Sequence, residues 1–132
     1  MSDQTNHPLT PCPASPNCVS SLATDTKHRV EPYMLAEAAE DSKGTESSWA
    51  KITTIVAGLP RSKIVAQKTG YLHVEISSLI FRFVDHLELA AEAGTQRVDV
   101  RSASTLGYSD LGVNRKRVEM LRAQFKDAGL LQ

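Results

Sequence analysis

The sequence lacks several features that would assign it to a common functional class. Its 15 Lys and Arg residues balance 15 Asp and Glu residues, so no net positive charge draws it to nucleic acid or to an anionic membrane. No apolar run approaches the roughly 20 residues of a membrane-spanning helix. It also lacks the G-x-x-x-x-G-K phosphate loop and the G-x-S-x-G turn of α/β-hydrolases. We therefore expect no nucleic-acid partner, no membrane span, and neither of these two hydrolytic chemistries.

Length and the first residues bear on organisation and location. A chain of 132 residues, 41% of them hydrophobic, suits one domain with a single core. Residues 1–10 are polar and lack the charged start and apolar stretch of a signal peptide. As written, the sequence therefore predicts a cytoplasmic protein. An exported or membrane-associated location is the alternative if a leader is missing.

The sequence divides into an amino-terminal segment, residues 1–25, and an expected single α+β domain, residues 26–132. The segment is rich in serine and proline and contains both cysteines. Its four prolines each remove a backbone donor, so we expect irregular structure through about residue 23. These prolines are Pro8, Pro11, Pro13 and Pro16.

Hydrophobic periodicity predicts the elements of the domain. Strands are expected at residues 27–33, 64–68, 71–77, 81–92 and 97–103, and helices at residues 45–57 and from a cap at Asn114 to near Gly129. The order β-α-β-β-β-β-α predicts one antiparallel sheet of four to five strands with two helices on one face. In the strand at 81–92 the alternation breaks, which predicts a bulge or bend near Asp85.

Alternation also assigns side chains to the two faces of the sheet. Leu72, Val74, Ile76, Val98 and Val100 are predicted to face the core. The opposite face is predicted to carry Tyr71, His73, Glu75, Ser77, Arg97, Asp99 and Arg101.

Separated motifs resemble one known family. They are Pro11-Cys12-Pro13 with Ser15-Pro16-Asn17-Cys18-Val19-Ser20-Ser21, then Tyr71-Leu72-His73-Val74-Glu75, then Phe81-Arg82-Phe83-Val84-Asp85, and finally residues 101–117. In this order, over about residues 9–125, the sequence resembles the domain-of-unknown-function 1499 family. The resemblance implies no activity, because the family has none assigned. Its members often have an exported or membrane-attached amino terminus, whereas this sequence begins almost directly at the first motif.

Cys12 and Cys18 enclose five residues, two of them proline. This spacing differs from the C-x-x-C of thioredoxin-type redox sites and zinc knuckles. Reduced structural thiols, a disulfide, and metal or redox chemistry all remain open, although a cytosolic location favours thiols. Zinc needs two further ligands, and the spacing of the nearest histidines, His7 and His28, does not favour them. We expect no metal.

The outward sheet face gathers ionisable side chains. A histidine beside a carboxylate can act as general acid and base, which makes His73, Glu75 and Asp99 the catalytic candidates. Cross-strand ion pairing on a solvated face is the ordinary alternative. The full set is His73, Glu75, Arg82, His86, Glu88, Asp99 and Arg101.

The second helix begins with Arg115, Lys116 and Arg117, although a helix amino terminus disfavours cations. Either Asp110 or Glu119 pairs with these cations, or the helix start binds an anionic group. The ligand-binding candidates are Arg101, Ser104, Tyr108, Asp110, Asn114 and Arg115.

These observations favour a small binding module for an anionic or amphipathic small molecule, or for a partner segment. One alternative is an enzyme that uses a His and carboxylate pair, with Arg101 stabilising a developing negative charge. Another is a structural or interaction protein whose sheet edge pairs with a partner. We expect no cofactor, and a small-molecule anion or a protein as partner. The sequence does not determine the oligomeric state.

Overall fold

The computed structural model describes residues 7–39, 47–78, 83–105, 107 and 110–132. It confirms the predicted α+β class, with a sheet and two helices in β-β-α-β-β-β-β-α order. The elements are β1 (Cys18–Ser20), β2 (Tyr33–Met34), α1 (Ser48–Ala57), β3 (Ser62–Lys68), β4 (Tyr71–Ser77), β5 (Val84–Ala91), β6 (Arg97–Ser104) and α2 (Val113–Asp127).

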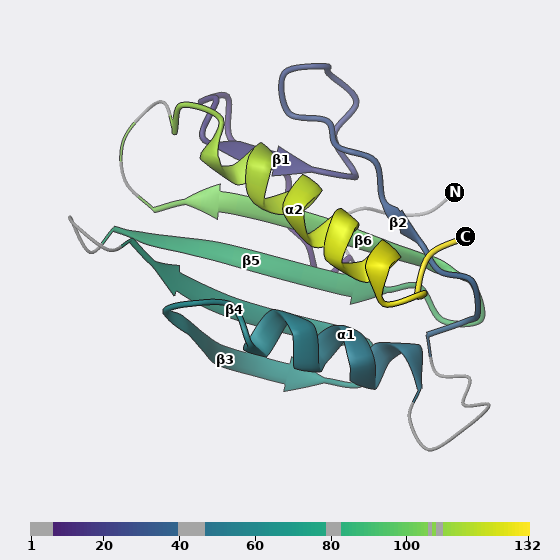
Figure 1. Ribbon diagram of the computed structural model, residues 1–132. Helices are drawn as coiled ribbons and strands as arrows, with labels where there is room; N and C mark the ends of the chain where they lie inside the picture. The colour runs from purple at the N-terminus through teal and green to yellow at the C-terminus, as the bar shows by residue number, and fades with distance from the viewer. Residues whose placement is uncertain (1–6, 40–46, 79–82, 106, 108–109) are drawn as a thin grey trace.

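The sheet is antiparallel, with the strand order β1-β6-β5-β4-β3 (Figure 1). Strands β3 to β6 form a meander of neighbouring strands, as predicted. Gly70 and Gly94 adopt φ angles of 72° and 74° in its first and last turns, a region that glycine enters without a steric penalty. Strand β6 pairs with β5 on one side, and with both β1 and β2 on the other.

Strand β1 corrects the prediction that the chain is irregular through residue 23. Cys18 pairs with Ala103, and Ser20 pairs with Arg101. Pro16, the last of the four early prolines, precedes the strand, so proline removes none of its donors. Pairing with a strand more than 80 residues away is a tertiary contact, which local composition does not reveal.

Two further details differ from the prediction. No bulge occurs at Asp85, which pairs in continuous register with Ile76 and with Ser104. The alternation breaks there because Asp85 faces inward and is itself buried. The register instead shifts on β3, between Ile64 and Ala66. Of the strand expected at residues 27–33, only the last residue, Tyr33, belongs to a named strand, β2.

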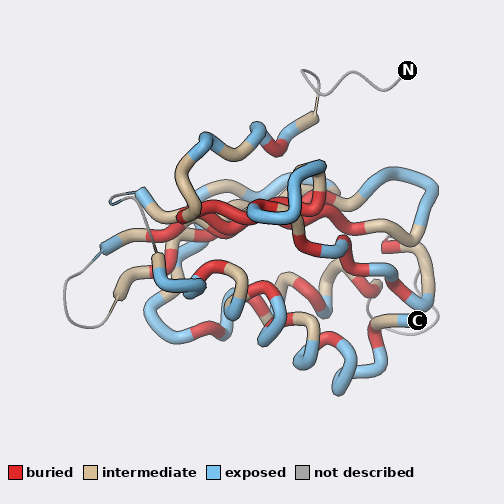
Figure 2. Tube along the Cα trace, turned by 90° about the horizontal axis from the view of Figure 1, so that it is seen from above, coloured by how far each residue is buried: buried red, intermediate tan, exposed pale blue. Residues whose placement is uncertain are grey.

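Both helices cover one face of the sheet, as predicted (Figures 1 and 2). Ser47 caps the start of helix α1: its hydroxyl accepts a 3.1 Å hydrogen bond from the Ala50 amide, which satisfies one unpaired amide of the first turn. Burial of each large apolar side chain stabilises the fold by about 1.5–3 kcal/mol. The fully buried core between helices and sheet contains Ile52, Val56, Leu72, Val74, Leu87, Leu89, Val98, Val100, Val118, Leu121 and Phe125.

Tyr33 joins this core to the second helix. Its ring meets the Phe125 ring edge-on, with centroids 5.0 Å apart, and its hydroxyl donates a 2.7 Å hydrogen bond to the Val118 carbonyl. The Arg122 guanidinium lies 4.7 Å from the ring centroid, in a cation–π contact. Burial raises the pKa of Tyr33 well above its ordinary value.

The other side of the sheet, which we call the far face, is partly covered by the amino-terminal segment. Figure 2 shows this segment on the side of the sheet away from the helices. Leu9 is 1% exposed yet does not belong to the core between helices and sheet. The far face is therefore not a fully solvated surface near β1 and β6.

Candidate functional site

Cys12 and Cys18 form a disulfide, with their α-carbons 5.7 Å apart. Of the three states that the sequence left open, the structure has the bridged one. No free cysteine occurs among the described residues. Within the same residues, no group of three or more His, Cys, Asp or Glu side chains is placed to hold a metal ion.

The bridge fixes a segment that we call the strap, residues 7–12. At one end of the strap, His7 Nε2 lies 3.5 Å from a carboxylate oxygen of Asp99. At the other end, Cys12 is bonded to Cys18, the strand partner of Ala103. Asp99, Arg101 and Ala103 alternate onto the far face of β6. The strap therefore passes across β6 near Arg101, whose side chain is only 14% exposed.

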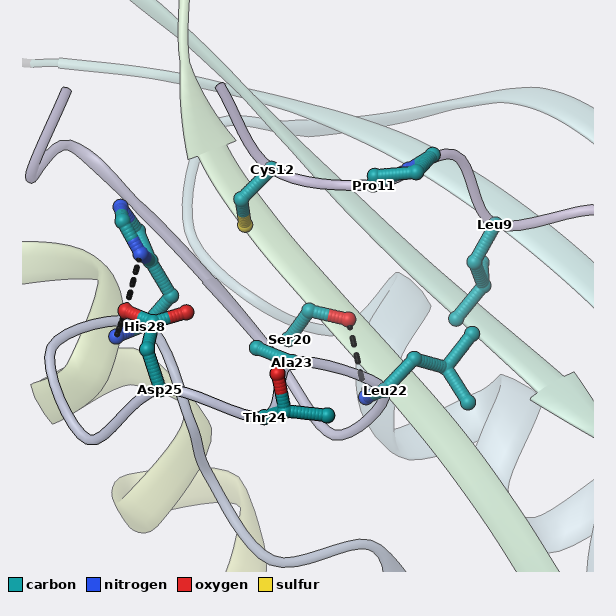
Figure 3. Close-up of a pocket in the computed structure, with 9 residues that line it drawn as sticks. All are labelled: Leu9, Pro11, Cys12, Ser20, Leu22, Ala23, Thr24, Asp25 and His28. Carbon is teal, nitrogen blue, oxygen red and sulfur yellow. Dashed lines mark hydrogen bonds and ion pairs between the residues drawn. The ribbon is translucent and has the colours of Figure 1, made fainter. Parts of the chain in front are cut away.

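A cavity of about 200 Å³ opens between the strap and the loop that follows β1 (Figure 3). Leu9 and Leu22 lie close to one another at one end, with Pro11 nearby, whereas Asp25 and His28 lie at the other end. The cavity is thus apolar at one end and polar at the other. Its complete lining is Leu9, Pro11, Cys12, Ser20, Leu22, Ala23, Thr24, Asp25 and His28.

The polar end is organised by His28, which is buried. Its Nδ1 lies 2.6 Å from a carboxylate oxygen of Asp25, and its Nε2 lies 2.9 Å from the Ser15 carbonyl. The hydrogen bond with His28 holds the pKa of Asp25 below its ordinary value. The polar end of the cavity thus presents the Asp25 carboxylate, bonded to a buried imidazole.

The catalytic candidates lie on the far face, but they are not hydrogen-bonded to one another within the described residues. His73 Nε2 lies 2.8 Å from His86 Nδ1, so the partner of this histidine is a second imidazole. Asp99 accepts hydrogen bonds from Ser21 at 2.7 Å and from Arg97 at 3.0 Å. Glu75 has no such partner in the described part of the chain.

A second polar chain crosses the far face beside the histidines. The Tyr71 hydroxyl donates a 2.5 Å hydrogen bond to Glu88, and Arg101 reaches the other oxygen of that carboxylate at 3.5 Å. Burial, followed by the hydrogen bond to Glu88, raises the pKa of Tyr71. Arg101 Nε is buried without an acceptor in the described structure. Since solvent does not reach this atom, a ligand in solution does not reach it either.

Three of the predicted ligand-binding residues lie on the helix side of the sheet, in a buried polar network. The Asn114 amide nitrogen donates to Ser104 at 2.9 Å and to Asp110 at 2.7 Å. Asn114 is fully buried and lies inside the first turn, so the prediction that it caps the helix was wrong. The preceding Gly112, at a φ of 81°, is the cap residue.

Asp110 performs the capping role instead. Its carboxylate accepts hydrogen bonds from the Gly112 amide at 2.8 Å and from the Asn114 amide at 3.1 Å. Burial raises the pKa of Asp110, but the hydrogen bonds from Asn114 and Gly112 outweigh this effect, so the pKa stays below its ordinary value. An ionised carboxylate at this point also offsets the positive end of the helix dipole.

The cations of the first turn find other partners than the predicted Asp110 and Glu119. Arg115 donates to the backbone carbonyls of Arg29 at 2.7 Å and Lys27 at 3.0 Å. Arg117 forms a 2.8 Å ion pair with Asp85, and both side chains are 12% exposed. Glu119 pairs with Arg122.

The structure does not gather the six ligand-binding candidates into one surface. Arg101 lies on the far face of the sheet. Ser104 lies on the opposite face, where it contacts Asn114 of helix α2. Arg115 is held against the loop around Lys27. Tyr108 lies outside the described residues.

Sequence reasoning missed the cavity, including Leu9, Leu22, Thr24 and Asp25. The only local signal was the spacing of Asp25 and His28, since a side chain three residues before a histidine can bond it across a turn. The two walls, the strap and the loop after β1, are joined by the Cys12–Cys18 bridge, which the sequence left open.

The architecture defines a class: an α+β protein in which two helices cover one face of an antiparallel sheet and a disulfide-bonded segment crosses the other. The chain belongs to the family described as "Protein of unknown function (DUF1499)", whose model matches residues 8–125. A search of curated proteins and a search of solved structures find no match. No helix among the described residues is long and apolar enough to cross a membrane.

Proposed function

We propose that this protein is a binding module for a small amphipathic molecule, which it holds in the cavity beneath the strap. The main support for this proposal is the cavity itself, which has Leu9, Pro11 and Leu22 at one end and the Asp25–His28 pair at the other. Small-molecule sites combine apolar walls with placed polar groups that orient the ligand, and this cavity offers both kinds of wall.

The distribution of charge favours a neutral amphipathic ligand over an anionic one. A carboxylate oxygen of Asp25 lies 2.6 Å from His28 Nδ1, so the cavity already contains an acidic group. Arg101 faces Glu88, and Arg115 is bonded to backbone carbonyls. Arg101 and Arg115 thus already have acceptors, and an anion would gain little that these partners do not supply.

The volume limits the size of the ligand. Sites for drug-sized molecules span about 300–1,000 Å³, whereas an engineered cavity of about 150 Å³ binds benzene. A cavity of about 200 Å³ therefore suits a molecule slightly larger than benzene, or one end of a larger ligand.

Three probes that share a benzyl or benzoyl skeleton test the class of ligand: benzyl alcohol, benzoate and benzylamine. We expect benzyl alcohol to bind most tightly, with chemical-shift changes at the methyl groups of Leu9 and Leu22 in NMR titrations. Preferential binding of benzoate would favour the anionic alternative. Absence of shift changes at both leucines with all three probes would refute the proposal.

Two variants locate the binding site. Ala23→Leu places a larger side chain in the cavity wall and should abolish probe binding. Ala93→Leu makes the same change at an exposed position outside the cavity and should leave it unchanged. Equal affinity in both variants would place the ligand elsewhere.

Binding ranks above catalysis in this proposal because His73 pairs with another imidazole and not with a carboxylate. The cavity also lies under the strap, while His73 lies on β4, beyond β5 and β6.

The disulfide supports an oxidising compartment, because glutathione and thioredoxin keep most cytosolic thiols reduced. We therefore propose the exported or membrane-associated location, in place of the cytoplasmic one. Alkylation of free thiols in cells that have been acid-quenched and denatured tests it: labelling of Cys12 and Cys18 would argue for a reducing compartment.

A further inference from the structure

We propose that the Cys12–Cys18 disulfide is a redox latch that controls access to the cavity. The oxidised bridge keeps the strap closed over the ligand, and reduction by a dithiol releases the strap. This inference rests on the proposed function, since it assigns a regulator to the same cavity.

Few contacts other than the disulfide hold the strap. Within the described residues, no backbone hydrogen bond joins the strap, residues 7–12, to the rest of the protein. The remaining attachments are the burial of Leu9 and the 3.5 Å contact between His7 and Asp99. Loss of the bridge therefore leaves the strap with one apolar anchor and one weak polar contact.

The chain beyond the strap is anchored independently. The Asn17 carbonyl accepts a 2.9 Å hydrogen bond from the Ser104 amide, and the Ser15 carbonyl faces His28. Cys18 and Ser20 remain paired with β6 through the backbone. Reduction is thus expected to free the strap without detaching β1, so the opening is local.

Exposure directs the reductant to one of the two sulfurs. Cys18 is fully buried, whereas Cys12 is partly exposed and lines the cavity. A thiolate of the dithiol attacks Cys12 Sγ and forms a mixed disulfide, and the bond to Cys18 Sγ breaks. The second thiol then attacks the reductant's own sulfur and releases Cys12. The protein gains two electrons and two protons as two thiols, while the dithiol becomes a cyclic disulfide.

Ligand binding and reduction oppose each other in this arrangement. A ligand in the cavity lies against Cys12 and blocks the approach of the thiolate. Conversely, opening of the strap removes Leu9 and Pro11 from the cavity wall. By linkage, the factor by which reduction weakens binding equals the factor by which the ligand disfavours reduction. A disulfide that closes a loop of this size restricts the chain entropy, so its reduction should lower the ratio of closed to open strap by about 10- to 100-fold.

The latch can be tested by NMR of the oxidised protein, the protein reduced with dithiothreitol, and the Cys12→Ala variant. We expect the nuclear Overhauser contacts between the methyl groups of Leu9 and Leu22, which lie close together in the cavity, to be lost on reduction, while the amides of Val19 and Ser20 keep their protection from hydrogen exchange. Benzyl alcohol affinity should fall by about tenfold or more. Cys12→Ala should behave like the reduced protein, and dithiothreitol should not change it further. Saturating benzyl alcohol should also slow the reduction of the wild-type bridge.

The outcomes separate the latch from the proposed function. Retention of the Leu9–Leu22 methyl contacts on reduction would overturn the latch, and so would loss of β1 protection, which would make the bridge a general support of the fold. Benzyl alcohol affinity that is equal in the oxidised and reduced proteins would overturn the control of binding but support the cavity. Loss of the Leu9–Leu22 contacts on reduction, without any probe binding to the oxidised protein, would support the moving strap and refute the proposed function.

Discussion

The side-chain amide of Asn114 donates a 3.2 Å hydrogen bond to the backbone carbonyl of Asn17, 97 residues earlier in the chain. This contact connects the start of α2 to the residue just before β1. The oxygen of the same amide accepts hydrogen bonds from Ser102 at 2.6 Å and from Arg117 at 2.7 Å. One buried side chain thus joins the amino-terminal segment, strand β6 and the second helix.

Substitution of Asn114 should be among the most destabilising changes in the protein. Asn114→Ala leaves the buried groups of Ser102 and Arg117 without this partner, and we expect a loss of about 3 kcal/mol in the free energy of unfolding. Urea denaturation measures the loss. Gln124→Ala, on an exposed part of the same helix, is the control and should change stability by less than about 0.5 kcal/mol. Similar losses in the two variants would show that the network contributes little.

The ion pair between Asp85 and Arg117 should show strong energetic coupling. Because both side chains are largely buried, loss of one partner leaves a desolvated charge and should cost about 3–5 kcal/mol. We expect the double variant Asp85→Asn with Arg117→Met to be more stable than the sum of the single losses predicts. A double-mutant cycle from urea denaturation gives the coupling energy. Additive losses would contradict a direct interaction.

Asp110 should contribute to the loss of stability in acid. Its folded pKa lies below its ordinary value, so its contribution is fully present above the unfolded pKa, about 3.9, and is lost as the pH falls through the folded pKa. Asp110→Asn keeps a side chain that caps helices well but removes the titration. The variant should lose less stability than the wild type between pH 5 and pH 2. Urea midpoints across this range give the comparison, and parallel curves would exclude the contribution.

Tyr33 should affect stability at the other end of the pH scale. Burial raises its folded pKa, so its contribution is complete below the unfolded pKa of about 10 and declines as the pH rises above it. Tyr33→Phe removes this decline, together with the hydrogen bond to Val118, at a cost of about 1 kcal/mol at pH 7. The difference in stability between the two proteins should narrow above pH 10. A constant difference would show that Tyr33 ionises equally in the folded and unfolded states.

The sequence predicted those parts of the fold that depend on local pattern. Leu72, Val74 and Ile76 alternate without interruption, and β4 has the predicted bounds, Tyr71–Ser77. Gly70 marked the turn before this strand. In these segments the burial of one sheet face and the conformation of the turn agree, so periodicity alone identifies the element.

Sequence reasoning failed where a polar side chain is satisfied by a distant partner. Asp85 broke the expected alternation because it faces Arg117 on a helix that begins about 30 residues later. Arg115 suggested an anion site because its partners, the carbonyls near Lys27, are backbone atoms that any residue supplies. The cavity was not predicted because its two walls, the strap and the loop after β1, are joined by a disulfide that the sequence left open.

The pairing of Cys18 with Ala103 also bears on whether disulfide formation or strand pairing comes first while the chain is synthesised. The ribosome produces β6 about 85 residues after β1, a delay of roughly 4–17 s at typical elongation rates. The two cysteines need no distant partner to meet, because only five residues separate them. Oxidation of this small ring can therefore precede folding, and we expect the nascent chain to deliver β1 to the completed meander with its covalent ring already closed.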